Sequence, residues 1–265
     1  MQTKQLTMRD FLIHTIPKGM LLPQPVLALF EAAFSLAQGK GYGTASLDEE
    51  IAACLKLLGA RAKTVLDIGA NKGCYSEKLL KKLPNARFFL FEPSKENIAV
   101  LNSKFANQPR VQILDTALSD QSGTATLFAN ESGSGLASLT KRRMDHFSIE
   151  FKHEEPVRMQ RFDEFWPQHN IPMIDYCKID VEGHELSVLK GFGAWLDHVK
   201  LIQFEFGGCN IDTRTYFQDF WYYFTERGFA LYRITPFGPK RIQKYTEQDE
   251  FFRTTNYIAL NEKQA

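Results

Sequence analysis

Short apolar runs alternate with segments of helical periodicity along most of this chain. The runs that predict strands are residues 64–68, 86–91, 110–114, 175–179, 199–206, 229–234 and 257–260. Apolar residues spaced three and four apart predict helices at residues 73–83, 95–105, 185–192 and 215–227. Such alternation favours an α/β fold, with a mostly parallel seven-stranded sheet and helices on both faces.

Two helical patterns, at residues 25–38 and 47–58, precede the first strand. Ser46, followed three residues later by Glu49, predicts a capped start for the second helix. Because a complete α/β pattern follows these helices, we expect residues 1–60 to form a helical N-terminal accessory segment. We expect this segment to cover the main domain or its acceptor site.

The main domain is expected at residues 61–265, and its pattern departs from the alternation in two places. Residues 235–255 join the last two strands without a helix, which allows an antiparallel strand at the sheet edge. An insertion at about 119–165 contains two exposed-strand patterns, TATLF and VRMQ. The Ser/Gly-rich segment between them, residues 130–138, is either a lid over the acceptor or a disordered surface loop.

Charge and cysteine usage exclude some classes of protein. Lys and Arg number 32 and Asp and Glu number 31, so the net charge of +1 attracts neither nucleic acid nor an anionic membrane. The four cysteines are scattered without zinc-site spacing, which fits a reducing, cytoplasmic compartment. The apolar stretch at residues 19–37 is interrupted by Pro23, Pro25 and Glu31, so we expect no membrane span. The oligomeric state stays open.

The turn after the first strand has the layout of a nucleotide-binding loop. It reads DIGANKG and has two glycines separated by three residues. A dinucleotide cradle has the spacing G-x-G-x-x-G and a phosphate loop ends in Gly-Lys-Ser/Thr, and this turn has neither. We expect Asp67, Gly69, Asn71 and Gly73 to surround a cofactor, although the same spacing also serves a tight strand-to-helix turn.

The next two strands end in residues suited to adenosine. Glu92, followed by Pro93, ends the second strand, where an acid accepts both ribose hydroxyls. Asp115 ends the third strand and is placed to accept the exocyclic amine of adenine, with backbone groups of Thr116 and Ala117 beside it. A pocket for adenosine without a pyrophosphate cradle indicates S-adenosylmethionine.

The fourth strand leads into the sequence IDVEGHE, which carries the candidate catalytic residues. Ligands lie beyond the carboxyl ends of parallel strands, so we expect Asp180, Glu182 and His184 beside the cofactor and the acceptor. His184 precedes a predicted helix, whose N-terminus favours a neutral imidazole that can accept a proton. Asp180 also suits a nearby cationic sulfonium. The alternatives are a capping or surface role for His184 and a turn cap for Asp180.

A divalent metal site is the less favoured interpretation of this region. Glu205 ends the fifth strand and, together with Asp180, provides two carboxylates of the kind that binds Mg²⁺. Only Asn210 and Asp212 suggest themselves as a third ligand. We therefore expect no metal and keep Mg²⁺-assisted methyl transfer as an alternative.

Five motifs resemble those of the FkbM-type S-adenosylmethionine-dependent methyltransferases. They are VLDIGANKG, FEPSKEN, ALSDQSGTATL, RFDEF and CKIDVEGHELSVLKG. The resemblance extends over about residues 64–260, and its specific part is KIDVEGHE followed by LKG, whereas RFDEF departs from a Leu-Asp-Glu pattern at Phe162. It implies a Rossmann-like class I methyltransferase fold and O-methylation in glycan or secondary-metabolite biosynthesis. It does not identify the acceptor.

Two further functions stay open at this point. A nucleic-acid base methyltransferase typically carries an Asn/Asp-Pro-Pro-aromatic motif, whereas the fourth strand here leads into IDVEG, and a net charge of +1 disfavours a polyanionic substrate. A non-catalytic adenosine-binding module would lack the acids expected near the acceptor. We therefore expect an enzyme that methylates a hydroxyl of a sugar, a glycan or a secondary metabolite, with no nucleic-acid partner.

Overall fold

The computed structural model describes residues 23–43, 46–59 and 61–264. It divides into two compact units, Met1–Ser35 and Leu36–Ala265, so the division falls after Ser35 and not after residue 60. The helix α2 (Gln24–Ala37) confirms the first predicted helix. Within the described ranges, no helix combines the length and the hydropathy that a membrane span requires.

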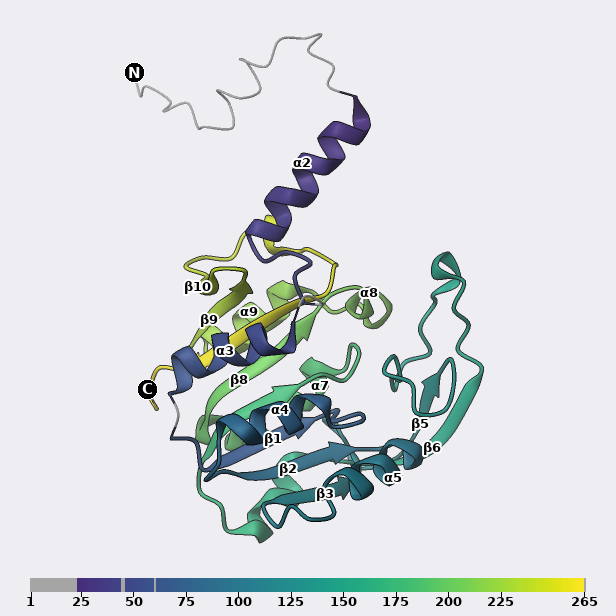
Figure 1. Ribbon diagram of the computed structural model, residues 1–265, viewed down its shortest axis with the longest axis vertical. Helices are drawn as coiled ribbons and strands as arrows, with labels where there is room; N and C mark the ends of the chain where they lie inside the picture. The colour runs from purple at the N-terminus through teal and green to yellow at the C-terminus, as the bar shows by residue number, and fades with distance from the viewer. Residues whose placement is uncertain (1–22, 44–45, 60, 265) are drawn as a thin grey trace. The chain divides into compact units, whose positions relative to one another are not determined.

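An eight-stranded sheet in the order β10-β9-β11-β8-β7-β1-β2-β3 forms the centre of the second unit (Figure 1). Its strands are β1 (Thr64–Ile68), β2 (Arg87–Glu92), β3 (Val111–Asp115), β7 (Ile174–Ile179), β8 (Val199–Phe206), β9 (Phe229–Thr235), β10 (Gly238–Arg241) and β11 (Thr255–Asn261). The five strands from β8 to β3 are parallel to one another. All seven predicted strands are present, and this strand order confirms the α/β, Rossmann-like fold.

The eighth strand, β10, comes from the segment that we expected to be a loop. It pairs with β9 in an antiparallel hairpin and forms the edge of the sheet. The last strand, β11, is also antiparallel, but it lies between β8 and β9. Burial explains this placement, because every residue of β11 is buried, whereas β10 carries Pro239 and the exposed Lys240 and Arg241, which suit an edge.

Helices cover both faces of the sheet. On one face, α3 (Leu47–Leu58), α4 (Cys74–Lys82) and α5 (Lys95–Lys104) share a core cluster with the strands. On the other face, α7 (Glu185–Gly191) and α9 (Phe217–Thr225) pack into a second cluster, rich in phenylalanine. Two short helices, α6 (Phe162–Phe165) and α8 (Cys209–Thr213), follow the insertion and β8. The predicted helices are therefore confirmed.

The helix α3 belongs to the main domain, although we expected it in a separate accessory segment. Its residues Ile51 and Cys54 are buried in the core cluster that also contains Leu201 of β8. Ser46 stands at its N-cap but makes no side-chain capping bond, and Glu49 instead accepts a hydrogen bond from the Tyr42 hydroxyl. The predicted capping box is therefore wrong.

The insertion forms a small three-stranded sheet in the order β4-β6-β5. Its strands are β4 (Ala117–Leu118), β5 (Gly123–Ala129) and β6 (His153–Gln160), so the TATLF and VRMQ patterns are confirmed as strands. The Ser/Gly-rich segment follows β5 and is tied back to it, because Phe128 and Ser138 exchange backbone hydrogen bonds of 2.8 and 2.9 Å.

Candidate active site

The parallel strands bring several charged residues to their carboxyl ends, on one face of the sheet. Asp67 of β1 stands beside Lys178 of β7, and Glu92 of β2 stands beside Asp115 of β3. Side chains alternate along a strand, so these groups share the face covered by α3, α4 and α5. The apolar runs thus position polar side chains where the strands end, as ligand sites in open parallel sheets require.

The glycine turn after β1 depends on a close approach between two backbones. Gly69 has a φ of +83°, and a Cβ at this position would lie 1.9 Å from the carbonyl oxygen of Asp180. Only glycine fits there. Asn71 follows with a φ of +48°, a conformation that asparagine adopts more readily than most residues.

Glu92 is held by the turn and by the start of α5. Its Oε2 accepts the backbone N–H of Asn71 at 2.8 Å, and its Oε1 accepts the backbone N–H of Ser94 at 3.0 Å. Burial raises the pKa of Glu92, and these N–H groups oppose that shift. The Asn97 side-chain amide also donates to Oε1, at a longer 3.4 Å. A carboxylate has about four acceptor positions, so Glu92 keeps one for a ligand hydroxyl, and a second hydroxyl would replace the long bond from Asn97.

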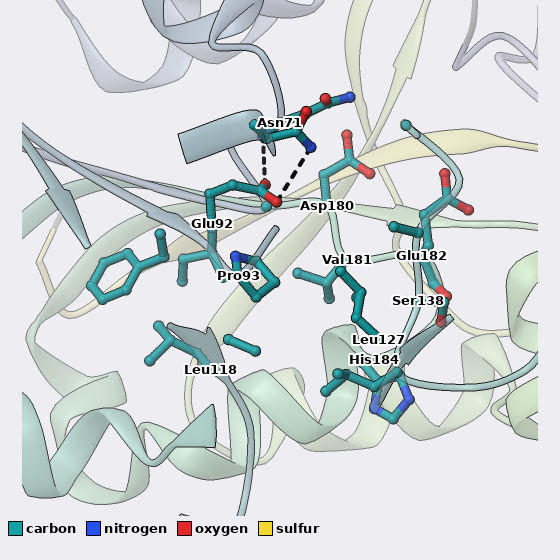
Figure 2. A pocket seen from close by; sticks show the side chains of 18 of the residues that line it. Asn71, Glu92, Pro93, Leu118, Leu127, Ser138, Asp180, Val181, Glu182 and His184 are labelled. Carbon is teal, nitrogen blue, oxygen red and sulfur yellow. Dashed lines mark hydrogen bonds between the residues drawn. The ribbon is translucent and has the colours of Figure 1, made fainter. Parts of the chain in front are cut away.

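A first cavity opens beside Glu92 (Figure 2). Of the predicted site residues, it is lined by Gly69, Asn71, Glu92, Pro93, Thr116, Ala117, Asp180, Glu182 and His184. Its remaining wall is largely apolar and includes Leu118, Leu127 and Val181. The side-chain oxygens of Asn71 and Asn97, which also line it, are buried without a partner. The cavity thus combines an apolar slot, a ribose-type acid and free acceptors, and such a set of acceptors suits the hydroxyl and amine donors of adenosine.

Three predicted cofactor residues do not line this cavity. Asp67 is buried and accepts the Ser76 hydroxyl at 2.6 Å, and burial raises the pKa of its carboxyl. Gly73 is the N-cap of α4 with a φ of +71°, and a Cβ there would meet Leu101 at 2.7 Å. Asp115 is exposed at the end of β3. In the structure these residues therefore shape the turn, the helix start and the strand end.

The segment after β7 holds the catalytic candidates in a fixed loop. Asp180 pairs with Lys178 at 2.8 Å. Burial alone would lower the pKa of Lys178, but Asp180 and Asp67 hold it above its ordinary value. Glu185 is buried, and its Oε1 accepts the backbone N–H groups of Val181 and Gly183, each at 3.1 Å.

Glu182 occupies a strained position inside this loop. Its φ is +52°, in the left-handed region that a glutamate rarely adopts. Burial, reinforced by Asp180, raises the pKa of Glu182 to about 7. Strain and burial together make Glu182 a functional candidate.

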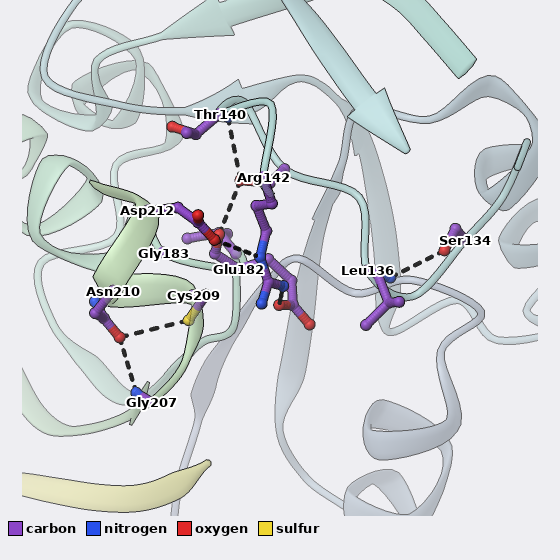
Figure 3. A network of polar contacts seen from close by, with 12 residues as sticks. Ser134, Leu136, Thr140, Arg142, Glu182, Gly183, Gly207, Cys209, Asn210 and Asp212 are labelled. Atoms are coloured by element: carbon purple, nitrogen blue, oxygen red, sulfur yellow. Dashed lines mark hydrogen bonds and ion pairs between the residues drawn. The ribbon is translucent and has the colours of Figure 1, made fainter. Parts of the chain in front are cut away.

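The insertion contacts this loop through three side chains that the sequence analysis missed. The Ser138 hydroxyl donates to the carbonyl oxygen of Glu182 at 2.8 Å, and Thr140 Oγ1 lies 2.8 Å from His184 Nε2. Arg142 is almost fully buried and pairs with both Glu182 and Asp212 (Figure 3). Burial lowers the pKa of His184, so its imidazole is neutral at pH 7. The motif KRRMDHF indicated a lid but not which of its cations turns inward.

A second cavity of about 670 Å³ lies on the other side of Glu182. Glu205 and Cys209 line it, and one ligand atom from each of these residues and Glu182 lies within 4.8 Å of the others. Burial, reinforced by Asp180 and Glu182, raises the pKa of Glu205. The structure therefore groups Glu205 with Glu182 and Cys209. Of the other predicted metal ligands, Asp212 pairs with Arg142.

Comparison with known proteins gives one family. Residues 67–231 match the family model described as the Methyltransferase FkbM domain, and the matched stretch covers more than half of the chain.

Among named relatives, the 2-O-methyltransferase NoeI of Sinorhizobium fredii is 26% identical over 152 residues, which cover 54% of this chain and 62% of NoeI. Methyltransferase sdnD of Sordaria araneosa is 30% identical over 153 residues, which cover 48% of this chain and 59% of sdnD. The methyltransferase FkbM structure from Methylobacillus flagellatus aligns with a TM-score of 0.44 and 14% identity, over 75% of this chain and 44% of that one. The matches therefore span less than two thirds of the length of each relative.

Proposed function

Because the chain belongs to the FkbM methyltransferase family, we propose that it is an enzyme that transfers a methyl group from S-adenosylmethionine to a hydroxyl of a sugar, a glycan or a secondary metabolite. The relative NoeI is named as an O-methyltransferase, which supports oxygen as the acceptor atom. The balanced net charge of +1 supports an acceptor other than nucleic acid. The four free cysteines support a cytoplasmic location.

The arrangement around Glu92 carries this proposal. The carboxylate is fixed by two backbone N–H groups and lines a cavity with an apolar slot on one side. We assign both ribose hydroxyls to Glu92 and the adenine ring to the slot formed by Pro93, Leu118 and Val181. The glycine turn then lies beside the amino-acid end of the cofactor, where backbone groups of Gly69 can bind it.

The cofactor supplies a methyl carbon on a positively charged sulfur, which an oxygen attacks in line. The acids Asp180 and Glu182 both line this cavity, and Glu182 also lines the second one, so we place the positively charged sulfur beside them. During transfer, the acceptor oxygen forms a bond to the methyl carbon, the carbon–sulfur bond breaks with its electron pair on sulfur, and the hydroxyl proton passes to a base. The chain's main task is to hold the oxygen roughly 3 Å from the methyl carbon.

Two positions are candidates for the base. His184 is neutral and lines the cofactor cavity, and we keep it as the candidate that the sequence predicts. The carboxylates of Glu182 and Glu205 line the second cavity, where the acceptor would lie. Substitution of His184 separates these candidates.

We also propose that the segment at residues 134–142 acts as a lid. The first cavity has a volume of about 80 Å³, and Ser134, Ser138 and Leu139 of this segment are among the residues that line it. A nucleoside cofactor needs more room, so the segment must open before the cofactor enters. The contacts of Ser138 and Thr140 with residues 182–184 would then re-form over the bound cofactor.

Calorimetry with S-adenosylmethionine and with NAD, on the same protein preparation, tests the cofactor. Heat of binding is expected for S-adenosylmethionine alone. Transfer of a labelled methyl group to neutral glycosides, with transfer RNA as the comparison substrate, then tests the reaction. Heat with NAD and none with S-adenosylmethionine would overturn the cofactor assignment, and labelling of the RNA alone would favour a nucleic-acid methyltransferase.

A further inference from the structure

Lys178 is a buried cation next to the cofactor cavity. It is 6% exposed, and its Nζ lies 2.8 Å from Oδ2 of Asp180. Asp180 lines the first cavity (Figure 2), whereas Lys178 does not. Lys178 therefore acts on a bound cofactor through its charge and through its hold on the Asp180 carboxylate.

The surroundings of Lys178 keep its ammonium group charged. Lys178 and Asp67 are paired positions of β7 and β1, and the Nζ lies 4.9 Å from the centre of the Tyr75 ring on α4. Burial lowers the pKa of this ammonium group, but the carboxyls of Asp180, Asp67 and Glu50 hold it above its ordinary value. A charged ammonium group has no lone pair, so Lys178 cannot be the base that takes the acceptor proton.

This position brings a fixed positive charge close to a cofactor that is itself a cation at sulfur. The charge repels the sulfonium, and the ion pair occupies the carboxylate that the sulfonium would otherwise attract. The product S-adenosylhomocysteine has a neutral sulfur and is spared both effects. Lys178 therefore opposes binding of the reactant more than binding of the product.

The same opposition favours the transfer step. Positive charge leaves the sulfur as the methyl group moves to the acceptor oxygen. A free carboxylate beside the sulfonium would stabilise the reactant more than the transition state, and this difference would raise the barrier. A carboxylate whose charge is offset by a fixed cation stabilises the reactant less, so the barrier stays lower.

We propose that Lys178 is a positioning residue that withholds the Asp180 carboxylate from the sulfonium. The buried pair keeps Asp180 in the cavity wall and offsets its charge. The proposal rests on the proposed methyltransferase function, from which the place of the sulfur beside Asp180 is taken. It adds a residue that acts on the cofactor without lining its cavity.

The ratio of the dissociation constants of S-adenosylmethionine and S-adenosylhomocysteine tests this proposal. The two ligands differ in the methyl group and the charge on sulfur, so their other contacts cancel in the ratio. Calorimetry of the full chain at pH 8 measures both constants. In Lys178→Met, Kd for S-adenosylmethionine divided by Kd for S-adenosylhomocysteine should fall on the order of tenfold, because the released carboxylate pairs with the sulfonium. A purely structural role for Lys178 would weaken both ligands alike and leave the ratio unchanged.

Further variants separate the charge from the side chain. Lys178→Arg keeps the positive charge and should retain the parent ratio. Asp180→Asn leaves the ammonium group without this partner, so the ratio should rise. The double variant, Lys178→Met with Asp180→Asn, removes both charges and should have a ratio close to that of the parent. Lys190→Met, at an exposed position of α7, is the matched control and should also keep the parent ratio.

Each result has a separate meaning. A ratio that is unchanged or raised in Lys178→Met would overturn the role of Lys178, and so would a ratio for Lys178→Arg that equals that of Lys178→Met. If Lys178→Met does not fold, the comparison of Asp180→Asn with the double variant decides, because the ratio should be lower in the double variant and equal ratios would overturn the proposal. Absence of binding of either ligand to the parent protein would instead contradict the proposed function.

Discussion

The Oε2 atom of Glu92 accepts the backbone N–H of Asn71 at 2.8 Å, and this bond joins the end of β2 to the glycine turn after β1. The two residues are 21 positions apart in the chain. Their contact holds the carboxylate in place before any ligand arrives. A preformed acceptor loses less conformational entropy on binding, so the position of Glu92 has a direct consequence for cofactor affinity.

Substitution of Glu92 by Gln should weaken binding of S-adenosylmethionine by about 1.5–3 kcal/mol, the contribution of hydrogen bonds to a charged group. Glutamine keeps an acceptor for the Asn71 N–H and loses the one for the Ser94 N–H, whereas alanine would leave both donors without a partner. Calorimetry measures the change in Kd. Glu96→Gln, at an exposed carboxyl on α5, is the control and should have the parent Kd. An unchanged Kd for Glu92→Gln would remove Glu92 from the ribose site.

Substitution of His184 by Ala should lower turnover about 10²–10⁴-fold if the imidazole is the base. Because burial lowers the pKa of His184 below its ordinary 6.5, the neutral form that accepts a proton is present above that pH. Activity should therefore rise with pH through a value below 6.5, and the variant should lose this acidic limb. The pH–rate profile of labelled methyl transfer measures both effects.

Thr140→Val is the matched control for His184, because it removes the hydroxyl at Nε2 and keeps the imidazole. It should retain more activity than His184→Ala. A nearly full-speed His184→Ala enzyme would move the base to Glu182 or Glu205. If a chelator also abolished that activity, the metal-assisted alternative would be favoured, with Glu182, Glu205 and Cys209 as candidate ligands.

Substitution of Ile51 by Ala should lower the free energy of unfolding by about 2–5 kcal/mol, because it opens a cavity under α3. Ile51 is buried in the core cluster that contains Leu201 and Ile258. Lys56→Ala, on the exposed face of the same helix, should change it by less than about 0.5 kcal/mol. Urea unfolding measures both.

A chain that begins at Arg61 tests the same helix and the predicted role of residues 1–60. It lacks α3, so it should unfold at lower urea concentration than a chain that begins at Leu36. Equal stability and turnover for the two chains would contradict the assignment of α3 to the main domain.

Substitution of Glu50 by Gln should stabilise the protein at high pH. Burial raises the pKa of Glu50 to about 7 from an ordinary 4.5. At pH values between 4.5 and 7, the folded state therefore keeps the proton on Glu50, whereas the unfolded state has released it. Stability contributed by this proton is present below pH 4.5 and is lost as the pH rises to 7. At pH 8 the variant should therefore gain up to about 3 kcal/mol, and at pH 4 it should gain almost nothing.

Urea midpoints of both proteins across this pH range measure the difference. Glu49→Gln is the control, because this neighbouring carboxyl is exposed. A gain for Glu50→Gln that is the same at pH 4 and pH 8 would contradict the raised pKa.

The strands and most helices were predictable because their signals are local. A run such as Thr64–Ile68 is mostly apolar and is buried along its whole length, and Gly69 is required by the turn that follows. The rule that ligands lie beyond strand ends then selected Glu92, Asp180 and Glu182. The fold and the position of the candidate site thus follow from short stretches of sequence.

Other features depend on contacts between distant parts of the chain, for which no local signal exists. Arg142 reaches Glu182 and Asp212, 40 and 70 positions away, and nothing in KRRMDHF distinguishes it from Arg143, which stays exposed. The position of β11 inside the sheet and the packing of α3 on it also depend on tertiary contacts, because each element occupies a part of the sheet that the other elements leave uncovered. By itself, therefore, the sequence determined the elements and the acids at their ends, since these reflect local hydrophobic periodicity. The tertiary structure alone decided which of those acids face a cavity and which cations neutralise them, because burial and pairing depend on the packing of the whole chain.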